Sequence, residues 1–218
     1  MQKKIYKKGA ILIYSGGMDS TVLLHQLKND IKLAVSFDYG SKHNQREIEC
    51  AKYNCKKLGI EHKIIELPFI NKYFKSSLLI SGNKIPKDNS NMKSTVVPFR
   101  NGIMLSIAVG LAESKNLDAV LIANHSGDHA VYPDCTPSFI NSFVKAAKFG
   151  TYNKIKIVSA YCHLSKRKIA KSGYKFLGVD FSKTYSCYKG NIEHCGVCAT
   201  CIERKKALKG FDNTTYKK

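Results

Sequence analysis

The sequence predicts an α/β protein in which helices cover both faces of a parallel sheet. Short apolar runs rich in β-forming residues alternate with stretches of helical character along the chain. Continuous apolar strands separated by helices are typical of a parallel sheet that is buried on both sides. The length of 218 residues fits one domain with a small appendage and is enough to bury a substantial core.

The predicted elements follow one another in a regular order. Strands are expected at residues 10–14, 32–37, 62–67 and 117–123. Helices are expected at residues 19–29, 44–58, 101–115 and about 138–149. The first helix carries Val22, Leu23 and Leu27 on one side, Gly59 ends the second, and the third is the most apolar of the chain.

Two stretches are expected to be irregular. Residues 68–98 form a connection that is too long for a simple linker between two elements, so this stretch predicts a lid or a substrate loop. The last residues, 214–218, are expected to be frayed because chain ends are poorly ordered unless something holds them.

Basic residues greatly outnumber acidic ones. The chain has 36 Lys and Arg against 16 Asp and Glu, which gives a net charge of +20. Only four of the basic residues are Arg, and the lysines are spread along the chain instead of forming a stripe. Because reading of base edges depends heavily on Arg, the charge favours a solvated, lysine-rich surface over a nucleic-acid partner. A positive field would still attract small anionic ligands.

The apolar pattern and the cysteines indicate a compartment. No apolar run approaches the roughly 20 residues of a membrane span, so we expect no membrane partner. The basic residues 1–8 are followed by an apolar stretch, 10–14, that is too short for a signal peptide. We therefore expect a cytoplasmic protein whose eight cysteines are thiols or metal ligands and not disulfides. Cys50, Cys55 and Cys162 are expected to be buried filler residues.

A glycine-rich turn, Ser15-Gly16-Gly17-Met18-Asp19-Ser20, joins the first strand to the first helix. It lies at the carboxyl end of a parallel strand, where open α/β sheets bind ligands. The glycines let backbone amides approach an anion, and the helix N-terminus directs its dipole at the same point. Ser15, Ser20 and Thr21 add hydroxyl donors. Asp19 would repel a phosphate, so we interpret it as a Mg²⁺-bridging or a helix-capping residue.

Four cysteines are gathered near the C-terminus. Cys187, Cys195, Cys198 and Cys201 lie within fifteen residues, and glycines between them permit the tight turns that converge sulfur atoms on one ion. The spacing favours one structural Zn²⁺ per chain. An iron–sulfur cluster is the alternative, although the ferredoxin ending Cys-x₃-Cys is absent. His194 is a conceivable replacement ligand.

Two further segments are hard to explain as scaffold. Val97-Pro98-Phe99-Arg100-Asn101 places a cation at the start of the apolar helix, where it opposes the helix dipole, so Arg100 is expected to face a ligand anion. Residues 124–135 follow a buried strand and place two His, two Asp and a Tyr in one loop. Loops at strand ends commonly carry functional sites.

The glycine-rich turn lacks the lysine of a Walker A loop and resembles the PP-loop of the N-type ATP pyrophosphatases. With the other segments it is similar to the 7-cyano-7-deazaguanine synthases of queuosine biosynthesis. The residues that carry this resemblance, in family order, are Ser15–Ser20, Asp38-Tyr39-Gly40 with His43, Val97-Pro98 with Arg100-Asn101, Gly127-Asp128 with Tyr132-Pro133-Asp134-Cys135, and Ser186–Cys201. They span nearly the whole chain.

The resemblance implies a fold, a reaction and a partner. It implies a Rossmann-like sheet of the adenine nucleotide alpha hydrolase type, with a PP-loop ligase domain at 1–185 and a zinc-binding segment at 186–218 packed on it. The implied activity is that of an ATP-dependent carbon–nitrogen ligase. Such an enzyme converts 7-carboxy-7-deazaguanine and ammonia to the nitrile through adenylated intermediates and releases AMP and pyrophosphate. A homodimer is also implied.

The resemblance assigns roles to individual residues. ATP and its Mg²⁺ are expected at Tyr14, Ser15, Gly16, Gly17, Met18, Asp19, Ser20, Thr21, Val22, Leu23 and Leu24. The deazapurine is expected at Arg100, Asn101, Asp128, Tyr132 and Asp134, with Asp128 and Asp134 accepting hydrogen bonds from its guanine-like face. Catalysis is expected to involve Asp19, Ser20, Arg100 and Lys166, where Arg100 or Lys166 neutralises carboxylate or pyrophosphate.

Three other functions remain open. A related enzyme would stop at the 7-amido product. A PP-loop sulfurtransferase acting on tRNA would use the net positive charge to hold RNA and a reactive cysteine to carry sulfur. A zinc module that binds nucleic acid without catalysis would leave the glycine-rich turn and the Tyr132–Cys135 motif without a purpose.

Overall fold

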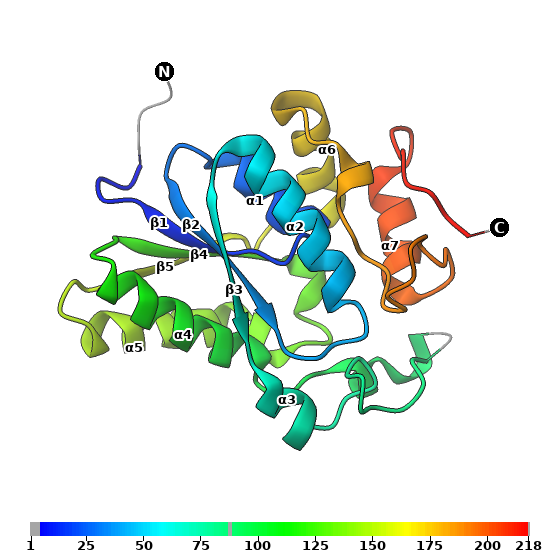
Figure 1. The fold of residues 1–218 in the computed structure, drawn as a ribbon, viewed down its shortest axis with the longest axis horizontal. Helices are drawn as coiled ribbons and strands as arrows, with labels where there is room; N and C mark the ends of the chain where they lie inside the picture. The colour runs from blue at the N-terminus through cyan, green and yellow to red at the C-terminus, as the bar shows by residue number, and fades with distance from the viewer. Residues whose placement is uncertain (1–4, 87–88, 218) are drawn as a thin grey trace.

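A five-stranded parallel sheet forms the centre of the molecule (Figure 1). The computed structural model describes residues 5–86 and 89–217. The strands are β1 (Ala10–Ile13), β2 (Ile31–Asp38), β3 (Glu61–Glu66), β4 (Ala119–His125) and β5 (Lys156–Tyr161). They lie in the order β3-β2-β1-β4-β5, and every pair of neighbours is parallel. The predicted fold class is confirmed.

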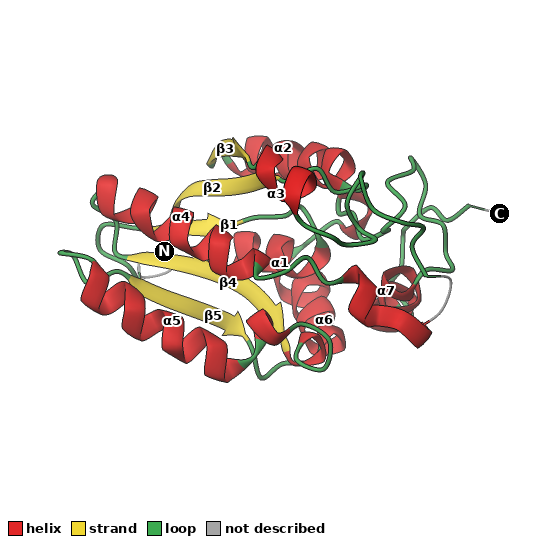
Figure 2. Ribbon diagram, turned by 90° about the horizontal axis from the view of Figure 1, so that it is seen from below, coloured by secondary structure: helices red, strands yellow, loops and turns green. Residues whose placement is uncertain are grey.

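Helices cover both faces of this sheet (Figure 2). One face carries α1 (Met18–Gln26), α2 (Asn44–Leu58) and α6 (Lys166–Leu177), and the other carries α4 (Arg100–Ser114) and α5 (Pro137–Gly150). Because successive strand residues point to opposite faces, Ile11 joins the core under α4, whereas Ala10 and Leu12 join the core under α1. Each face therefore buries its own hydrophobic core.

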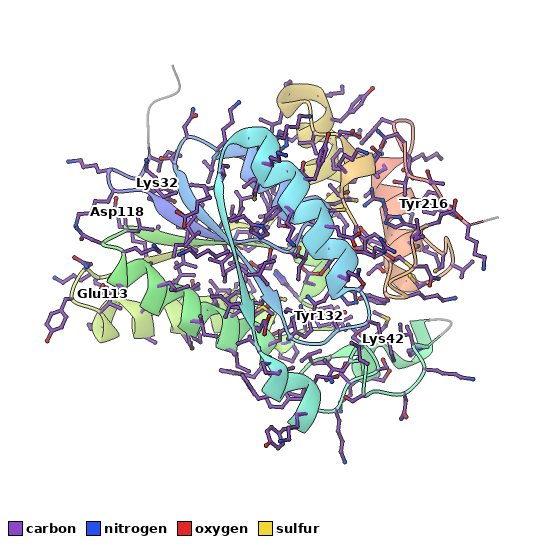
Figure 3. The ribbon with its side chains drawn as sticks, in the orientation of Figure 1. Lys32, Lys42, Glu113, Asp118, Tyr132 and Tyr216 are labelled. Carbon is purple, nitrogen blue, oxygen red and sulfur yellow. The ribbon has the colours of Figure 1, made fainter. Side chains whose placement is uncertain are left out.

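The remaining elements lie at the carboxyl end of the sheet. They are α3 (Pro68–Tyr73), α7 (Ala199–Leu208) and the 3-10 helices η1 (Asn89–Thr95), η2 (Ser126–Asp128), η3 (Pro133–Cys135) and η4 (Phe181–Lys183). The connection 68–98, expected to be irregular, contains α3 and η1, and its residues 87–88 lie outside the described part. Lys42 (Figure 3) holds this connection, because its Nζ donates to the carbonyls of Ser77, Gly82 and Asn83 at 2.7–3.1 Å.

The strands and helices expected from the sequence are all present, but one strand and three α-helices were not expected. β5, α6 and α7 fall in regions to which no element was assigned, and α3 falls in the connection expected to be irregular. The expectation that every strand is buried on both faces is wrong for β3, where no residue is fully buried. β3 is an edge strand, so it lacks a neighbour on one side. The filler cysteines also differ, because Cys55 is buried whereas Cys50 and Cys162 are only half-buried.

The chain end is held and not frayed. His194 N–H donates to Thr215 O at 3.2 Å, and Lys217 N–H donates to His194 O at 2.8 Å. Tyr216 lies beside α7, with the Lys205 ammonium 4.5 Å from its ring centre (Figure 3). The expectation of a frayed tail is therefore wrong for residues 214–217. Lys218, like residues 1–4 of the basic N-terminus, lies outside the described residues.

One apolar stretch is longer than expected. By length and composition alone, Met92–Ser114 would be able to cross a membrane. By that test, the expectation that no apolar run approaches the length of a membrane span is wrong. Half of its apolar window is buried inside the protein, and the core helix of a soluble protein passes the same test.

Candidate active site

A cleft of about 260 Å³ lies where β1, β2 and β4 end. The chain order of the sheet reverses between β1 and β4, and this switch point is where open α/β sheets bind ligands. The glycine-rich turn forms one part of its lining. The first turns of α2, α4 and α6, the loop after β4 and the C-terminal segment contribute the remainder.

The glycine-rich turn is packed directly against α2. Gly16 has φ +82°, and a Cβ at this position would clash with the carbonyl oxygen of Glu47 in the first turn of α2. Its own carbonyl accepts a hydrogen bond from Tyr185 N–H at 3.1 Å, so the C-terminal segment also holds the turn. Only glycine satisfies both the conformation and the close approach.

Hydroxyl groups stabilise the turn from inside. Ser15 Oγ accepts from Gly17 N–H at 3.1 Å and lies 3.0 Å from Ser20 Oγ. Thr21 Oγ1 donates to Gly17 O at 2.8 Å. No side chain caps α1, so the helix-capping interpretation of Asp19 is wrong and the first-turn amides of α1 remain directed at the cleft.

One wall of the cleft is a cluster of paired charges. Asp19 Oδ2 lies 3.4 Å from Lys166 Nζ, which also donates to Glu203 Oε2 at 2.9 Å. His125 Nε2 lies 3.6 Å from Asp128 Oδ1 and 3.9 Å from Asp19 Oδ2. Burial opposes the charge on Lys166, but the surrounding carboxylates raise its pKa above the ordinary value. Asp19, Asp128 and Lys166 line the cleft, whereas His125 and Glu203 contact them from outside the lining. We call these five residues the ion-paired wall.

A second part of the lining carries Arg100 among groups that burial shifts toward their uncharged forms. Arg100 begins α4, donates to Tyr39 Oη at 3.1 Å and lies with its guanidinium 5.6 Å from that ring. Burial raises the pKa of Glu47 to about 8, although Arg100 lowers it, and burial lowers the pKa of His43 to about 3. Tyr188 packs on His43, with ring centres 5.8 Å apart. We call these five residues the desolvated wall.

The Tyr-Pro-Asp-Cys motif holds the start of α4. Asp134 is buried, and its Oδ2 accepts from Asn101 N–H at 2.8 Å. Asn101 Nδ2 donates in turn to Cys135 Sγ at 3.1 Å. Tyr132 points to the cleft, where its hydroxyl lies 2.9 Å from that of Tyr188 (Figure 3). The motif therefore positions the helix start that presents Arg100.

Most of the predicted ligand residues meet in the cleft, but six do not line it. Those in the lining are Tyr14, Ser15, Gly17, Met18, Asp19, Ser20, Arg100, Asn101, Asp128, Tyr132 and Lys166. Those outside it are Gly16, Thr21, Val22, Leu23, Leu24 and Asp134. Val22, Leu23 and Leu24 pack in the core between α1 and the sheet. Asp134 is engaged by α4 through its Oδ2, and its contact with the purine stays a prediction.

The sequence analysis did not assign several lining residues. These are Glu47, Tyr185, Ser186, Tyr188 and Thr200. Glu47 lies four residues after His43 on one face of α2, a spacing that the sequence contains. Tyr185 and Ser186 precede the cysteine cluster, and Tyr188 and Thr200 lie between its cysteines. Their place in the cleft depends on how that segment folds back.

The four cysteines of the C-terminal segment can hold a metal ion. All four Sγ atoms lie within 4.8 Å of one another, and all four residues are buried. A tetrahedral ion with metal–sulfur bonds of about 2.3 Å requires sulfur separations of roughly 3.8 Å, and Cys195 Sγ lies 4.0 Å from Cys201 Sγ. Gly196, at φ +72°, makes the turn between two of the ligands. The donor set therefore fits a metal.

His194 is engaged outside this sulfur cluster. Its Nε2 accepts from Ser186 N–H at 3.1 Å, and its ring contacts those of Tyr185 and Tyr216. The histidine thus supports the segment through hydrogen bonding and ring packing, and the four cysteines provide the metal-binding group.

Comparisons with known proteins identify the family of this chain. The family model "Queuosine biosynthesis protein QueC" matches residues 9–212. The 7-cyano-7-deazaguanine synthase of Porphyromonas gingivalis is 54% identical over 205 residues, 93% of each chain, and that of Desulfotalea psychrophila is 52% identical over 215 residues, 95% of this chain and 98% of the other.

A solved structure shares the fold. NMN synthetase from Francisella tularensis superposes with a TM-score of 0.51 at 15% identity, over 94% of this chain and 79% of that one. At this identity the likeness concerns the fold alone. The extent of the sequence matches decides the family, and the chain belongs to the 7-cyano-7-deazaguanine synthase family of queuosine biosynthesis.

Proposed function

We propose that this protein is an ATP-dependent ligase that converts 7-carboxy-7-deazaguanine and ammonia to 7-cyano-7-deazaguanine. Two ATP molecules are consumed, and each yields AMP and pyrophosphate. The observation that carries the proposal is that the glycine-rich turn and Arg100 line one cleft in a member of this family. An anion-binding turn and a cation for the substrate carboxylate thus lie in the same cleft.

The chemistry explains why such a cleft is needed. A carboxylate is a poor electrophile, so its oxygen first attacks the α-phosphorus of ATP and expels pyrophosphate. Ammonia then displaces AMP and forms the amide. A second adenylation, on the amide oxygen, creates the leaving group whose departure gives the nitrile. Both adenylates need a cradle for phosphate and protection from water.

The ion-paired wall is assigned to the nucleotide. The amides of the turn and of the first turn of α1, with Ser15 and Ser20, would hold phosphate oxygens. Lys166 would neutralise pyrophosphate as it leaves. Asp19 Oδ1 is buried and has no hydrogen-bond partner among the described residues, which supports a role in binding Mg²⁺. When bound, Mg²⁺ would offset the negative charge of the triphosphate.

The desolvated wall is assigned to the deazapurine. Arg100 would pair with the carboxylate, and Tyr39 would hold its guanidinium in place. Tyr132 and Asp128 would contact the purine from the loop after β4. Asn101 and Asp134 would contribute by fixing the start of α4.

The metal-binding group is assigned to one structural Zn²⁺ per chain. Four thiolates saturate a tetrahedral ion, and its bound form would hold the C-terminal segment against the cleft. The segment itself provides Tyr185, Ser186, Tyr188 and Thr200 to the lining. We also assign the protein to the cytoplasm, as a homodimer, which gel filtration with light scattering would test.

The alternative of a tRNA sulfurtransferase finds less support. It requires a cysteine that is readily ionised. Cys135 is the cysteine in the cleft lining, and burial, with Asp128 and Asp134, raises the pKa of its thiol to about 12. Such a thiol is unreactive.

Product analysis tests the proposal. The protein is incubated with 7-carboxy-7-deazaguanine, ammonium and Mg-ATP, and the products are identified by mass spectrometry. We expect the nitrile together with two AMP and two pyrophosphate. Accumulation of the amide would identify the shorter reaction, and ADP formed in step with product would contradict the PP-loop assignment.

A further inference from the structure

We propose that Glu47 is the base that removes the N–H proton when the adenylated amide becomes the nitrile. The inference rests on the reaction proposed above and adds a residue that the family resemblance does not assign. Its support is the position of one carboxyl group relative to the glycine-rich turn, the surrounding charges and the cleft.

Glu47 lies against the phosphate-binding turn. It lines the cleft from the first turn of α2, whose backbone packs on Gly16. A Cβ at Gly17 would lie 3.9 Å from Glu47 Oε1, so the carboxyl group borders the point where a phosphate approaches the turn. In the adenylated amide, a single oxygen joins the α-phosphorus to the carbon that bears the N–H group. A base beside the turn is therefore within reach of that proton.

The other carboxylates bordering the turn are already engaged. Asp19 faces Lys166 at 3.4 Å, and Asp128 Oδ2 accepts from His125 N–H at 2.9 Å. Within residues 5–86 and 89–217, no Lys or Arg nitrogen lies within 4.0 Å of the Glu47 carboxylate. His43, which burial keeps uncharged, has its Nε2 at 3.8 Å from Glu47 Oε2. Glu47 is thus the acid of this cleft that is free to exchange a proton.

The surroundings of Glu47 match this role. Arg100 faces it from α4, His43 from the residue before α2, and Cys50 from the next turn of its own helix. Burial raises the pKa of Glu47 to about 8 against the opposing effect of Arg100. The carboxyl group is therefore mostly protonated at neutral pH and becomes a base as the pH rises through 8. A base whose pKa lies near the working pH is an efficient proton acceptor.

A second polar atom marks the same place. His43 is 5% exposed, and its Nδ1 is buried with no hydrogen-bond partner in the described part of the chain. Buried polar atoms are rarely left unpaired unless a ligand or water completes them. Because Nε2 is the ring nitrogen that faces Glu47, Nδ1 points to another side of the ring, where a polar atom of the bound substrate would supply the missing partner.

The step is balanced without another reactant. The first of the two amide protons is lost to solvent, which leaves the neutral imidate form of the adenylated amide. The Glu47 carboxylate then takes the remaining proton from nitrogen, and the electron pair of that N–H bond becomes the third carbon–nitrogen bond. The carbon–oxygen bond to AMP breaks, and its electron pair leaves on the phosphate oxygen. The products are the nitrile, AMP and protonated Glu47, which returns its proton to solvent.

Two half-reactions separate this role from adenylation. Nitrile formation is measured from 7-amido-7-deazaguanine and ATP, and adenylation is measured as exchange of labelled pyrophosphate into ATP with the carboxylate substrate and no ammonia. For Glu47→Gln we expect nitrile formation to fall about 100-fold or more, with exchange within about threefold of wild type because adenylation removes no N–H proton. Glu49→Gln is the matched control: this exposed acid on the same helix pairs with Arg46 at 2.8 Å.

The pH dependence of the wild-type protein gives a second test. Nitrile formation should rise with an apparent pKa near 8, and pyrophosphate exchange should lack this rise. A flat profile would overturn the proposal. So would a folded Glu47→Gln protein, verified by circular dichroism, that retains both half-reactions or loses both. If this variant does not fold, Glu47→Asp and the wild-type profile decide. A wild-type protein with neither activity would refute the proposed function itself.

Discussion

The two walls of the cleft contain similar ionisable residue types, but they differ in how the charges of these side chains are treated. In the ion-paired wall, Asp19 and Glu203 lie 3.4 and 2.9 Å from Lys166, so their charges are compensated in place. In the desolvated wall, the buried His43 and the mostly buried Glu47 lie beside one arginine, and removal from water shifts their pKa values toward the uncharged forms. A carboxylate beside an ammonium group keeps its charge, whereas a carboxyl group removed from water tends to keep its proton.

This difference suggests that one wall is suited to ligand binding and the other to proton transfer. Fixed charges suit the binding of phosphate and metal, which change position but not protonation. Groups with pKa values near neutrality suit proton transfer, which both amide formation and nitrile formation require. The following predictions test how far the two walls are independent, beginning with the change that should affect both.

Removing the metal should disrupt both walls together. The C-terminal segment supplies Glu203 to one wall and Tyr188 to the other, and structural zinc contributes about 10 kcal/mol or more to the folding of small zinc modules. Chelation or Cys198→Ala should therefore lower solubility and melting temperature before it alters substrate specificity. Thermal unfolding with metal analysis measures this, and Cys162→Ala, a half-buried thiol outside the cluster, is the control.

Two results would refute this prediction. One is a zinc-free protein with full thermal stability, which would mean that the cysteines fold the segment without an ion. The other is iron with sulfide in the purified protein, which would replace the structural zinc site by a cluster.

Asp19→Ala should affect one wall alone. The change removes the carboxylate nearest to Lys166 and the proposed Mg²⁺ ligand, so we expect kcat to fall about 100- to 1,000-fold, the range found when one preorganised electrostatic group is lost. Because Asp19 does not cap α1, the melting temperature should change little. Turnover and thermal unfolding are the measurements. Wild-type turnover would remove Asp19 from the nucleotide site.

Asp134→Asn should weaken the other wall indirectly. Asp134 accepts from Asn101 N–H at 2.8 Å and helps to keep the pKa of Arg100 high despite burial. The Asn side chain carries no charge, and it has an NH₂ donor in place of one of the two carboxylate acceptors. We therefore expect deazapurine affinity to fall about tenfold. This corresponds to about 1.4 kcal/mol, as for the loss of a buried charged hydrogen bond. Titration calorimetry measures this. Unchanged deazapurine affinity with weaker ATP use would place Asp134 on the nucleotide side.

The sequence predicted the glycine-rich turn better than the desolvated wall. The turn is a local feature, because two glycines between a strand and a helix specify its conformation and its place at the sheet edge. Glu47 and Tyr188 were missed because burial and the fold of the C-terminal segment give them their roles, and no short pattern reports either. Asp134 was assigned to the purine, although the tertiary contact with Asn101 turns it toward α4.

The missed elements have a similar cause. β5 mixes Lys156 and Ser159 with apolar residues, so it lacks the continuous apolar run of β1. α6 is amphipathic, and its N-cap Ser165 and its left-handed Gly178 were available as boundary signals. The sheet order, by contrast, cannot be read from local patterns, since it depends on crossovers that bring β4 beside β1.

Glu203→Gln should give the smallest effect and the sharpest test of charge compensation. Burial opposes the charge on Lys166, and Asp19, Glu203 and Asp128 together raise its pKa. Removing one carboxylate lowers that pKa, so Lys166 loses its proton at lower pH and the alkaline limb of the activity profile should move to lower pH. Glu203 is 41% exposed at its side chain, so the pair is screened and worth about 0.2–1 kcal/mol, or up to about a fivefold loss at neutral pH. The control is Glu193→Gln, an exposed residue in the same segment, which should leave both the rate and the pH profile unchanged. An alkaline limb that does not move in Glu203→Gln would show that Asp19 and Asp128 alone keep the pKa of Lys166 high.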